Sequence, residues 1–553
     1  MKISKLILTL ASIIAAATLY AQQTTEPART RIITYENQRK ALNAIADSSA
    51  YYTRLDNVSG VIRYRDDFFF PFRWVGRALF LHFEGMPAPG KLYINEELVG
   101  EFTDSRGHSE FDITKFAQEG NNSIRIEFTG SDILTEASDF DANNTGIAYL
   151  TSEPKIRIRD LSVQTKINQT NGALQLGAVV KSHFGNPKKI NVHFALYSPD
   201  GKELDVQKKD MSFENFSQDT VWFSTLVREV DMWSADAPLF YTAVLSIEYE
   251  GFRTQFISTK IGFREVTFTD KELAINGKVI SLGNVVEIPF RAEYALGEAE
   301  STQKIEALLK DLKSRGVKVV MPMEGAFAEN FYNAADNIGM YVVDQAAFNP
   351  TKESMLHELP QFSDIVIHRI SSRFLKHRNH PCVVAFSMGN SQDGFNLCEA
   401  YLEIKKLGDS RPIFAENVRN MWNSDIYFTR DGSTPKYNDR PVLNIESLNA
   451  ALSRAICPQA IVINELSGRN FEIVNNTDFI DLRQYKVNYT VLRGDKLVKS
   501  GAVSLTADSG KQQFRVPLED VKLTGKQPHT LNLEVVPVSH GVKNLHKQSF
   551  ALN

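Results

Sequence analysis

Hydrophobic and polar residues alternate along the chain from about residue 55 to residue 265. Segments such as "RALFLHFEG", "NSIRIEF", "INVHFALYSP" and "YTAVLSIEYEG" carry apolar side chains at every second position, and Gly, Asn and Asp turns separate them. This pattern predicts two successive antiparallel sandwiches. About seven short strands in roughly 100 residues, as in 155–265, are typical of an immunoglobulin-like sandwich. Alternation returns after about residue 460 and predicts a third β-domain.

Between about residues 270 and 457 the pattern changes to strands that alternate with helices. "TQKIEALLKDLKSRG" repeats apolar residues at helical spacing, and the strand "VKVVMPM" follows it. Similar pairs continue through "MYVVDQAAF", "CVVAFSMG" and "PIFAE" to "PVLNIES". Alternation of this kind predicts a parallel sheet, and we expect it to form a (β/α) barrel.

Composition fits a multidomain globular chain. The 553 residues exceed what one core accommodates, and they are 43% hydrophobic and 23% charged. A net charge of −4, without a basic stripe, argues against nucleic acid as a partner. The three cysteines, Cys382, Cys398 and Cys457, lack metal-ligand spacing and predict no disulfide framework.

The first 21 residues have the pattern of a secretory signal. Lys2 and Lys5 precede an apolar stretch from Leu6 to Leu19, and the small residue Ala21 precedes the expected cleavage point. The stretch is short for a membrane span, and no later segment is apolar enough to be one. An uncleaved anchor is the alternative. We expect an exported protein, in the periplasm or at the surface of a bacterial cell, with no membrane span in the mature chain.

Five segments resemble glycoside hydrolase family two, the group of β-galactosidases, β-glucuronidases and β-mannosidases. They are "VGRALFLHFEGMPAPGKLYINEELVGEFTDSRGHSEFDITKF", "DMWSADAPLFYTAVLSI", "IGFREVTF…LAINGK", "RNHPCVVAFSMGN" and "NFEIVNNTDFIDLRQYKV". They stand in the family's order and cover the chain from about residue 55 onward. The resemblance implies a jelly-roll sandwich, an immunoglobulin-like sandwich, a TIM-type (β/α) barrel and a C-terminal β-sandwich. We place a signal peptide at 1–21, an N-terminal segment at 22–54, and these four domains at 55–154, 155–265, 266–457 and 458–553.

A retaining glycosidase needs two carboxyl groups about 5–5.5 Å apart, one as nucleophile and one as acid/base. In the family a Glu follows the Gly-Asn that ends the fourth barrel strand. Here Gly389 and Asn390 are followed by Ser391, which cannot serve as the proton donor. Loss of general acid catalysis costs roughly 10²–10⁴-fold in rate. At the nucleophile, the resemblance puts Glu446 of "RPVLNIES" in register, and an ordinary strand-end Glu is the alternative.

Other positions depart from the family as well. Its Arg-Thr-Ser-His-Tyr-Pro stretch is replaced by "MPMEGA", with Met321 in place of the orienting Arg. Only 24 residues, none of them aromatic, separate Glu446 from Phe471, so the eighth strand and its Trp-Asp platform are missing. We expect an incomplete or open barrel, because the region has fewer than 190 residues and complete barrels usually have ~250. The family's sugar and Mg²⁺ ligands are mostly absent, so we expect no cofactor or metal.

Several residues near predicted strand ends could take over a role in this site. Asp393 and Glu324 are candidate acids, although each is also consistent with a solvated loop carboxylate. The candidate binding residues are Asn390, Glu416, Trp422 and Tyr427. A serine hydrolase centred on Ser391 is disfavoured, because "GNSQD" lacks the second Gly of G-x-S-x-G.

The losses at one face of the barrel favour a non-catalytic protein. Our first hypothesis is therefore a glycan-binding or scaffold protein that uses the barrel mouth or the β-domains. A weak or re-specialised β-glycosidase, with Glu446 as nucleophile, is the second. The third is a structural subunit of a cell-envelope assembly, which a large exposed apolar patch on a β-domain would favour.

Overall fold

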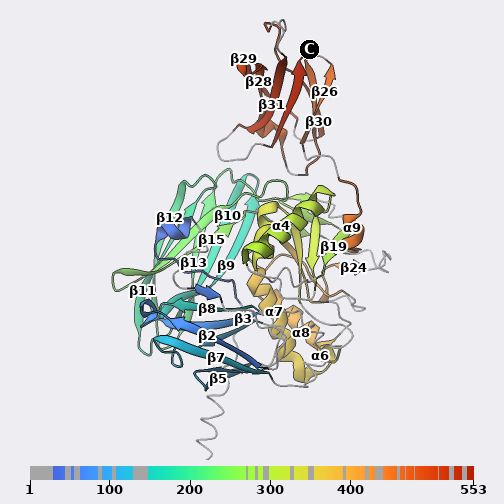
Figure 1. Cartoon of the computed structure of the whole chain (residues 1–553). Coiled ribbons are helices and arrows are strands. Elements are labelled where there is room, and N and C mark those ends of the chain that lie inside the picture. Colours follow the sequence, from blue (N-terminus) through green and yellow to red (C-terminus); the bar gives the residue numbers. More distant parts are fainter. Residues whose placement is uncertain are drawn as a thin grey trace, which may run out of the picture.

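The computed structural model shows four domains with separate cores (Figure 1). It describes residues 29–43, 52–54, 63–84, 90–102, 108–128, 147–269, 272–279, 284–289, 298–323, 329–346, 354–389, 394–416, 423–429, 440–456, 461–467, 469–478, 480–507, 510–521, 528–538 and 545–552. The signal sequence predicted at 1–21 lies outside these ranges. No helix of the described residues is long and apolar enough to cross a membrane.

The first domain is a sandwich of two four-stranded antiparallel sheets, in the orders β1-β8-β3-β6 and β2-β7-β4-β5. Apolar residues such as Leu81, Phe83 and Phe111 alternate along the strands and fill the space between the sheets. The elements are β1 (Tyr52–Arg54), β2 (Arg63–Phe70), η2 (Phe72–Trp74), β3 (Ala78–Glu84), β4 (Gly90–Ile94), β5 (Glu97–Phe102), β6 (His108–Asp112), β7 (Gly120–Phe128) and β8 (Ile147–Glu153).

The second domain pairs a three-stranded sheet, β13-β10-β9, with a four-stranded sheet, β12-β11-β14-β15. This is the seven-stranded antiparallel sandwich that the alternation predicts. Leu174, Leu176, Ala178 and Val180 are buried at every second position of one strand. The strands are β9 (Ile156–Asn168), β10 (Asn171–Ser182), β11 (Lys188–Tyr197), β12 (Glu203–Phe213), β13 (Gln218–Val227), β14 (Tyr241–Tyr249) and β15 (Phe252–Ile261).

Residues 29–43 pack against the second domain. Tyr35 forms a bridge with Phe256 of β15, and the helix α2 (Gln38–Leu42) begins at Asn37, whose side chain accepts a hydrogen bond from the Lys40 N–H. Ala41 packs with Tyr197 and Val244 of that domain. Nearer the N-terminus, the segment also reaches the barrel, because the Asn379 side chain donates to the Thr30 hydroxyl over 2.7 Å.

The third domain contains a small sheet, β16-β17-β18, and a seven-stranded parallel sheet in the order β23-β22-β21-β20-β19-β25-β24. The strands are β16 (Val266–Phe268), β17 (Leu273–Ile275), β18 (Lys278–Val279), β19 (Asn284–Ile288), β20 (Val319–Pro322), β21 (Tyr341–Gln345), β22 (Val383–Ser387), β23 (Ile413–Phe414), β24 (Tyr427–Thr429) and β25 (Val442–Ser447). The helices are α4 (Glu298–Ser314), α5 (Glu329–Ile338), α6 (Ser354–Glu358), η4 (Pro360–Phe362), α7 (Ser363–His377), α8 (Phe395–Lys405) and α9 (Leu448–Leu452).

This sheet closes almost completely into a barrel. The seventh strand, β25, pairs directly with the first, β19, so the described residues leave no place for an eighth strand between them. At the other seam, between β23 and β24, the Asp425 N–H donates to the Ile413 carbonyl over 2.8 Å, and the Phe414 and Phe428 rings stack. The prediction of an incomplete TIM-type barrel is confirmed in strand number, but the ring is nearly closed rather than open.

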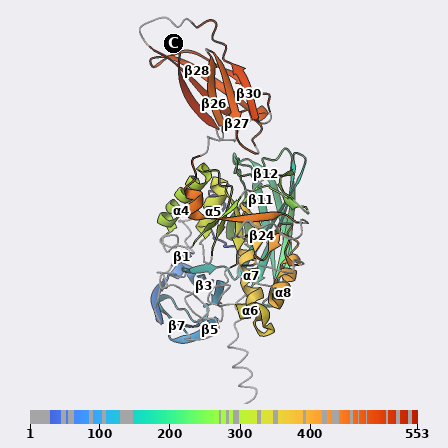
Figure 2. The ribbon, with the colours of Figure 1, turned by 90° about the vertical axis from the view of Figure 1, so that its right-hand side faces the viewer.

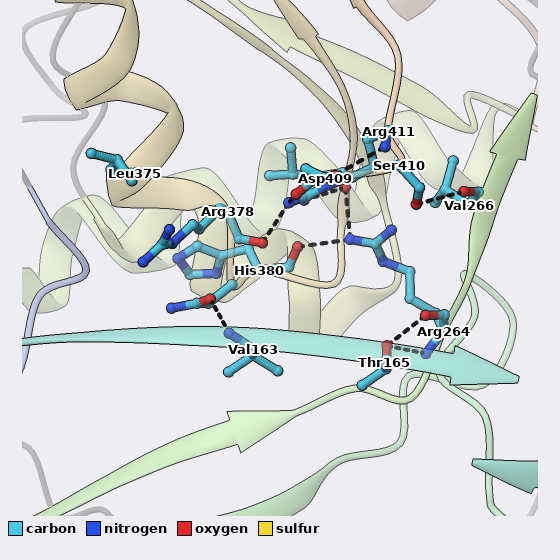
Figure 3. Close-up of polar contacts among 12 residues, drawn as sticks. Val163, Thr165, Arg264, Val266, Leu375, Arg378, His380, Asp409, Ser410 and Arg411 are labelled. Carbon is cyan, nitrogen blue, oxygen red and sulfur yellow. Dashed lines mark hydrogen bonds and ion pairs between the residues drawn. The ribbon is translucent and has the colours of Figure 1, made fainter. Parts of the chain in front are cut away.

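The second domain and the barrel are joined by buried polar contacts (Figure 3). Arg264 donates through Nη2 to the carbonyls of His380 and Val383, and its own carbonyl accepts from the Thr165 hydroxyl over 2.6 Å. Trp233, fully buried, donates through Nε1 to the Asp336 carbonyl over 3.2 Å. These contacts fix the orientation of the sandwich relative to the helices that surround the barrel.

The fourth domain is a second 3 + 4 sandwich that projects from the rest of the molecule (Figures 1 and 2). Its elements are β26 (Ile461–Ser467), β27 (Asn470–Asn475), η6 (Leu482–Gln484), β28 (Tyr485–Arg493), β29 (Lys496–Ser504), β30 (Gly510–Arg515), β31 (His529–Pro537) and β32 (His546–Leu552). Asp478 contacts both neighbours: its carboxylate pairs with Lys318 over 2.5 Å, and its N–H donates to Asp236 over 2.8 Å.

Candidate active site

Three polar side chains meet at the carboxyl ends of successive barrel strands. Glu416 follows β23, and its carboxylate accepts a hydrogen bond from the Ser387 hydroxyl of β22 over 2.7 Å. It also accepts from the Gln345 side-chain amide of β21 over 2.5 Å. Glu416 is only 3% exposed. Both of these hydrogen bonds reach the same carboxylate oxygen, Oε1, and both donors are neutral, so hydrogen bonds help to hold this buried carboxylate in place.

Glu446, at the carboxyl end of β25, has a different environment. Its carboxylate forms an ion pair with Arg454, which follows α9. The Glu446 side chain is 12% exposed and the Arg454 side chain 36%. The carbonyl of Arg454 in turn accepts from Arg315, just beyond the end of α4, over 2.5 Å. These contacts connect Glu446 to the outer helices of the barrel.

Strand register shows independently that the Glu446 side chain points toward the helices that surround the barrel. Glu446 pairs with Val286, Val286 with Val320, and Val320 with Val342. Paired residues share a face of the sheet, and so do residues two apart in one strand. Glu446 therefore shares a face with Asp344, whose carboxylate contacts side chains of α5 and α7. This face looks toward the helices.

The opposite face looks into the barrel. Gln345 pairs with Ser387, and Ser387 pairs with Phe414, so these residues share the face on which Glu416 is held. Phe414 stacks on Phe428, which pairs with Leu443 of β25. Leu443 and Glu446 are three residues apart and point to opposite sides. Glu446 and Glu416 thus lie on opposite faces of the sheet.

Asp344 is the centre of a buried polar network. Its carboxylate accepts from the Tyr332 hydroxyl over 2.7 Å and from Arg373 Nε over 2.8 Å, and it lies 2.8 Å from His377 Nδ1. Burial alone would raise the pKa of Asp344, but the neighbouring Arg373 and His377 hold it well below the usual range. Arg373 and His377 are four residues apart on α7, a spacing that places both on one helix face. That spacing was a usable sequence signal, and our sequence interpretation missed it.

The other predicted site residues divide into two groups. Tyr427 is buried, 6% exposed, on β24 in register with Val442, and Met321 is fully buried in β20. The remaining ones lie outside the described residues: Glu324, Asn390, Ser391, Asp393 and Trp422. The described site therefore comprises Glu416 with its two donors inside the barrel and Glu446 with Arg454 on the helix side.

Among the described residues, Asp336, His380 and Cys382 are close enough to suggest a metal site. Their atoms are already engaged: Asp336 accepts from the Cys382 N–H over 2.9 Å and lies 2.6 Å from His380 Nδ1. His380 Nε2 lies 2.9 Å from a Glu329 oxygen. Burial raises the pKa of the Cys382 thiol well above its usual value, so the thiolate that metals prefer is disfavoured. The trio therefore reads as a structural network.

Family comparisons agree with the domain order. Family models described as "Glycosyl hydrolases family 2, sugar binding domain", "Glycosyl hydrolases family 2" and "Glycosyl hydrolases family 2, TIM barrel domain" match residues 43–140, 156–264 and 266–454. The chain belongs to glycosyl hydrolase family 2. The Beta-galactosidase of Priestia megaterium is 28% identical over 382 residues, which are 64% of this chain and 36% of that protein. The Beta-galactosidase of Staphylococcus xylosus is 25% identical over 360 residues, 61% of this chain and 34% of that protein.

This family 2 chain thus matches only about a third of the length of its curated relatives. Solved structures support the fold. A glycosyl hydrolase family 2 member from Bacteroides cellulosilyticus has a TM-score of 0.59 at 15% identity, covering 88% of this chain and 76% of that one. The Bacteroides uniformis beta-glucuronidase has a TM-score of 0.60 at 12% identity, covering 96% and 80%.

Proposed function

We propose that this family 2 protein binds glycans without hydrolysing them. The observation that carries the proposal is the ion pair between Glu446 and Arg454 on the helix-facing side of the sheet. A nucleophile must reach the anomeric carbon with a second carboxyl group about 5–5.5 Å away. Glu446 and the buried Glu416 face opposite sides, and the acid/base position carries Ser391. The exported location predicted from residues 1–21 remains part of this proposal.

A binding surface for a sugar is available on the second domain. Trp222 of β13 is 40% exposed and lies directly over Gly177 of β10, since a Cβ atom added there would stand 2.8–3.0 Å from three atoms of the indole ring. Gln175 and Gln164, which pair in the same sheet, are exposed beside it. A flat aromatic ring flanked by amides offers stacking and hydrogen bonds to a sugar.

Hydrolysis is tested with a panel of activated aryl β-galactosides, glucosides, mannosides and glucuronides, with and without azide. An activated leaving group needs no proton donor, and azide replaces activated water in the second step. The proposal predicts no release above background in wild type. Azide-stimulated release that disappears in Glu446→Gln would instead support the competing hypothesis, a weak β-glycosidase, which the relatives named Beta-galactosidase favour.

Binding is tested on immobilised glycans. Trp222→Ala should reduce binding by up to about tenfold, because stacking on an aromatic ring contributes roughly 0.5–1.5 kcal/mol. Phe252→Ala, at a more exposed aromatic residue of the same domain (75% against 40% for Trp222), should have no effect. Equal binding by both variants would exclude the Trp222 surface as the glycan-binding site. If the wild-type protein bound no glycan, the proposed function would be wrong.

A further inference from the structure

The outward face of the sheet β13-β10-β9 in the second domain is a regular grid of side chains. Residues that pair across strands share a face of the sheet, as do residues two apart in one strand. The opposite face, which includes Leu174 and Leu176, is buried in the core of the sandwich. Strand register defines three outward rows, which we call the Trp222 platform: Trp222–Gly177–Ser162, Ser224–Gln175–Gln164 and Leu226–Ala173–Lys166.

The platform is open to solvent. All six side chains of its second and third rows are exposed, and Trp222 in the first row is 40% exposed. The indole of Trp222 lies over Gly177, and the other first-row residue, Ser162, is small. A ligand can therefore lie across the three strands without having to enter a pocket.

Trp222 and Lys166 occupy opposite corners of the platform. Two strand spacings of about 4.8 Å and four residue steps of about 3.4 Å separate them, which puts their Cα atoms about 17 Å apart. A pyranose ring is similar in size to the six-membered ring of the indole, so one sugar cannot span this distance. A ligand that contacts both corners must be a chain of several sugars.

The middle row supplies the polar groups that such a chain would cross. The Ser224 hydroxyl and the side-chain amides of Gln175 and Gln164 can each donate and accept hydrogen bonds. These groups are neutral and adaptable, and they match the hydroxyl groups of sugars. They do not by themselves distinguish one sugar from another.

Lys166 gives the platform a positive charge. Its side chain is exposed, and no ion pair or hydrogen bond among the residues that the structure describes involves its ammonium group. None of the nine platform positions carries an acidic residue. Lys209 adds a second cation at the edge beside Trp222, where its ammonium donates to the Trp222 carbonyl. The platform therefore favours a negatively charged ligand over a neutral one.

Neighbouring acidic residues leave the charge of Lys166 in place. Asp160 is fully buried and pairs with Arg378. Asp219 pairs in register with a buried core residue, so it belongs to the other face of the sheet. Glu229 lies beyond the end of β13, and the residue before it is an arginine, which offsets its charge.

We propose that the Trp222 platform binds an acidic oligosaccharide of about three or more sugars, with one sugar on Trp222 and a carboxylate or sulfate group at Lys166. The inference rests on the proposed glycan-binding function and specifies its class of ligand. Contact between the ammonium and such a group is a charge-assisted hydrogen bond, which is stronger than a neutral one.

Titration calorimetry of the full chain tests this with oligogalacturonates of one to six sugars, sulfated chondroitin oligosaccharides and neutral cello-oligosaccharides. We expect affinity to rise with chain length, and acidic chains to bind more tightly than neutral chains of the same length. Lys166→Gln should lower the affinity for acidic chains by about twofold to fivefold, as expected for one exposed charge pair. Added NaCl should reduce this difference, because it screens exposed charges.

Two further variants separate charge from platform geometry. Lys189→Gln removes an exposed lysine of β11 in the other sheet and should bind as wild type does. Gly177→Ala places a methyl group 2.8–3.0 Å from three atoms of the Trp222 indole and so displaces the ring without removing it. This variant should lose affinity for acidic and neutral chains alike.

The outcomes distinguish this inference from the proposed function. If neutral chains bind as tightly as acidic ones, or if Lys166→Gln binds acidic chains as wild type does, the inference is wrong although glycan binding stands. If a monosaccharide binds as tightly as a hexamer, the extended site is wrong. If no glycan binds at all, the proposed function fails and the inference with it. Binding of oligogalacturonates only, of sulfated chains only, or of both identifies the acidic group.

Discussion

The Nδ1 atom of His380 lies 2.6 Å from a carboxylate oxygen of Asp336, in the interior of the third domain. Its Nε2 atom lies 2.9 Å from Glu329, so the imidazole stands between two carboxylates. Burial alone would lower the pKa of His380, but the two carboxylates raise it to about 10. The ring is therefore a buried cation at neutral pH, and it joins α5 to the loop before β22.

This arrangement predicts a stability change at alkaline pH. The folded-state pKa of about 10 exceeds the unfolded value of 6.5, so the contribution is complete below pH 6.5 and is lost as the pH rises to 10. Urea unfolding of wild type from pH 6 to 10 should show a decline of up to about 1.4 kcal/mol per pH unit from this group. His380→Gln should be less stable at pH 6.5 and should show a flatter decline. Parallel curves for the two proteins would contradict the assignment.

We expect the protein to lose much of its stability when the charge of Asp344 is removed. Asp344→Asn keeps the shape of the side chain but removes the buried negative charge that pairs with Arg373, and breaking such a pair costs about 3–5 kcal/mol. The free energy of unfolding in urea measures this. Asp219→Asn, at an exposed position of the second domain, should change it by less than about 0.5 kcal/mol. A loss in Asp344→Asn no larger than in the control would mean that the network contributes little.

Two glycines share a left-handed backbone conformation but differ in the space around them. Comparing their alanine variants therefore separates the cost of backbone strain from the cost of a steric clash. Gly339 and Gly408 have φ values of +74° and +72°. A Cβ on Gly339 would collide with the backbone of Ala235, whereas a Cβ on Gly408 would meet nothing within 4 Å. Gly408→Ala should cost about 1–2 kcal/mol for the left-handed conformation. Gly339→Ala should cost at least about 2 kcal/mol more, measured by thermal unfolding, since the contact between the second domain and the barrel must move.

We expect Asp425 to stabilise the closure of the barrel at the seam between β23 and β24. Its carboxylate accepts from Lys405 over 2.6 Å, from the Tyr401 hydroxyl over 2.8 Å and from the Ile413 N–H over 2.8 Å. Asp425→Ala should lower the free energy of unfolding by about 2–4 kcal/mol, because it leaves the Ile413 N–H and the Tyr401 hydroxyl without their acceptor. Lys405→Met, which removes only the partly exposed cation, should cost about 1 kcal/mol or less. Equal effects would show that the charge pair, not the seam, matters.

Much of the fold could be predicted from local pattern. Leu174, Leu176, Ala178 and Val180 alternate in the sequence and are buried alternately in β10. Ile305, Leu309 and Leu312 follow helical spacing and form the buried side of α4. Burial of a sheet or helix face leaves a period in the sequence, and these elements have it.

The candidate site was less predictable, because strand register has no comparable signal. A shift of one residue turns every side chain of a strand to the other face. The motif "RPVLNIES" places Glu446 at a strand end but does not fix its face, which depends on the pairing of β25 with β19. The pairing of Glu446 with Arg454, eight residues later, likewise depends on how α9 packs. Residues 29–43 also carry no sign that their partner is the second domain.

Thr30 and Asn379 are in contact although 349 positions separate them in the chain. During synthesis, residues 29–34 therefore emerge long before the barrel surface that they contact exists. Contacts of such separation form late and slow the search for the native state. We therefore expect the docking of this segment to be the last step of assembly. In a refolding experiment, its docking would show that the second domain and the barrel are already in contact.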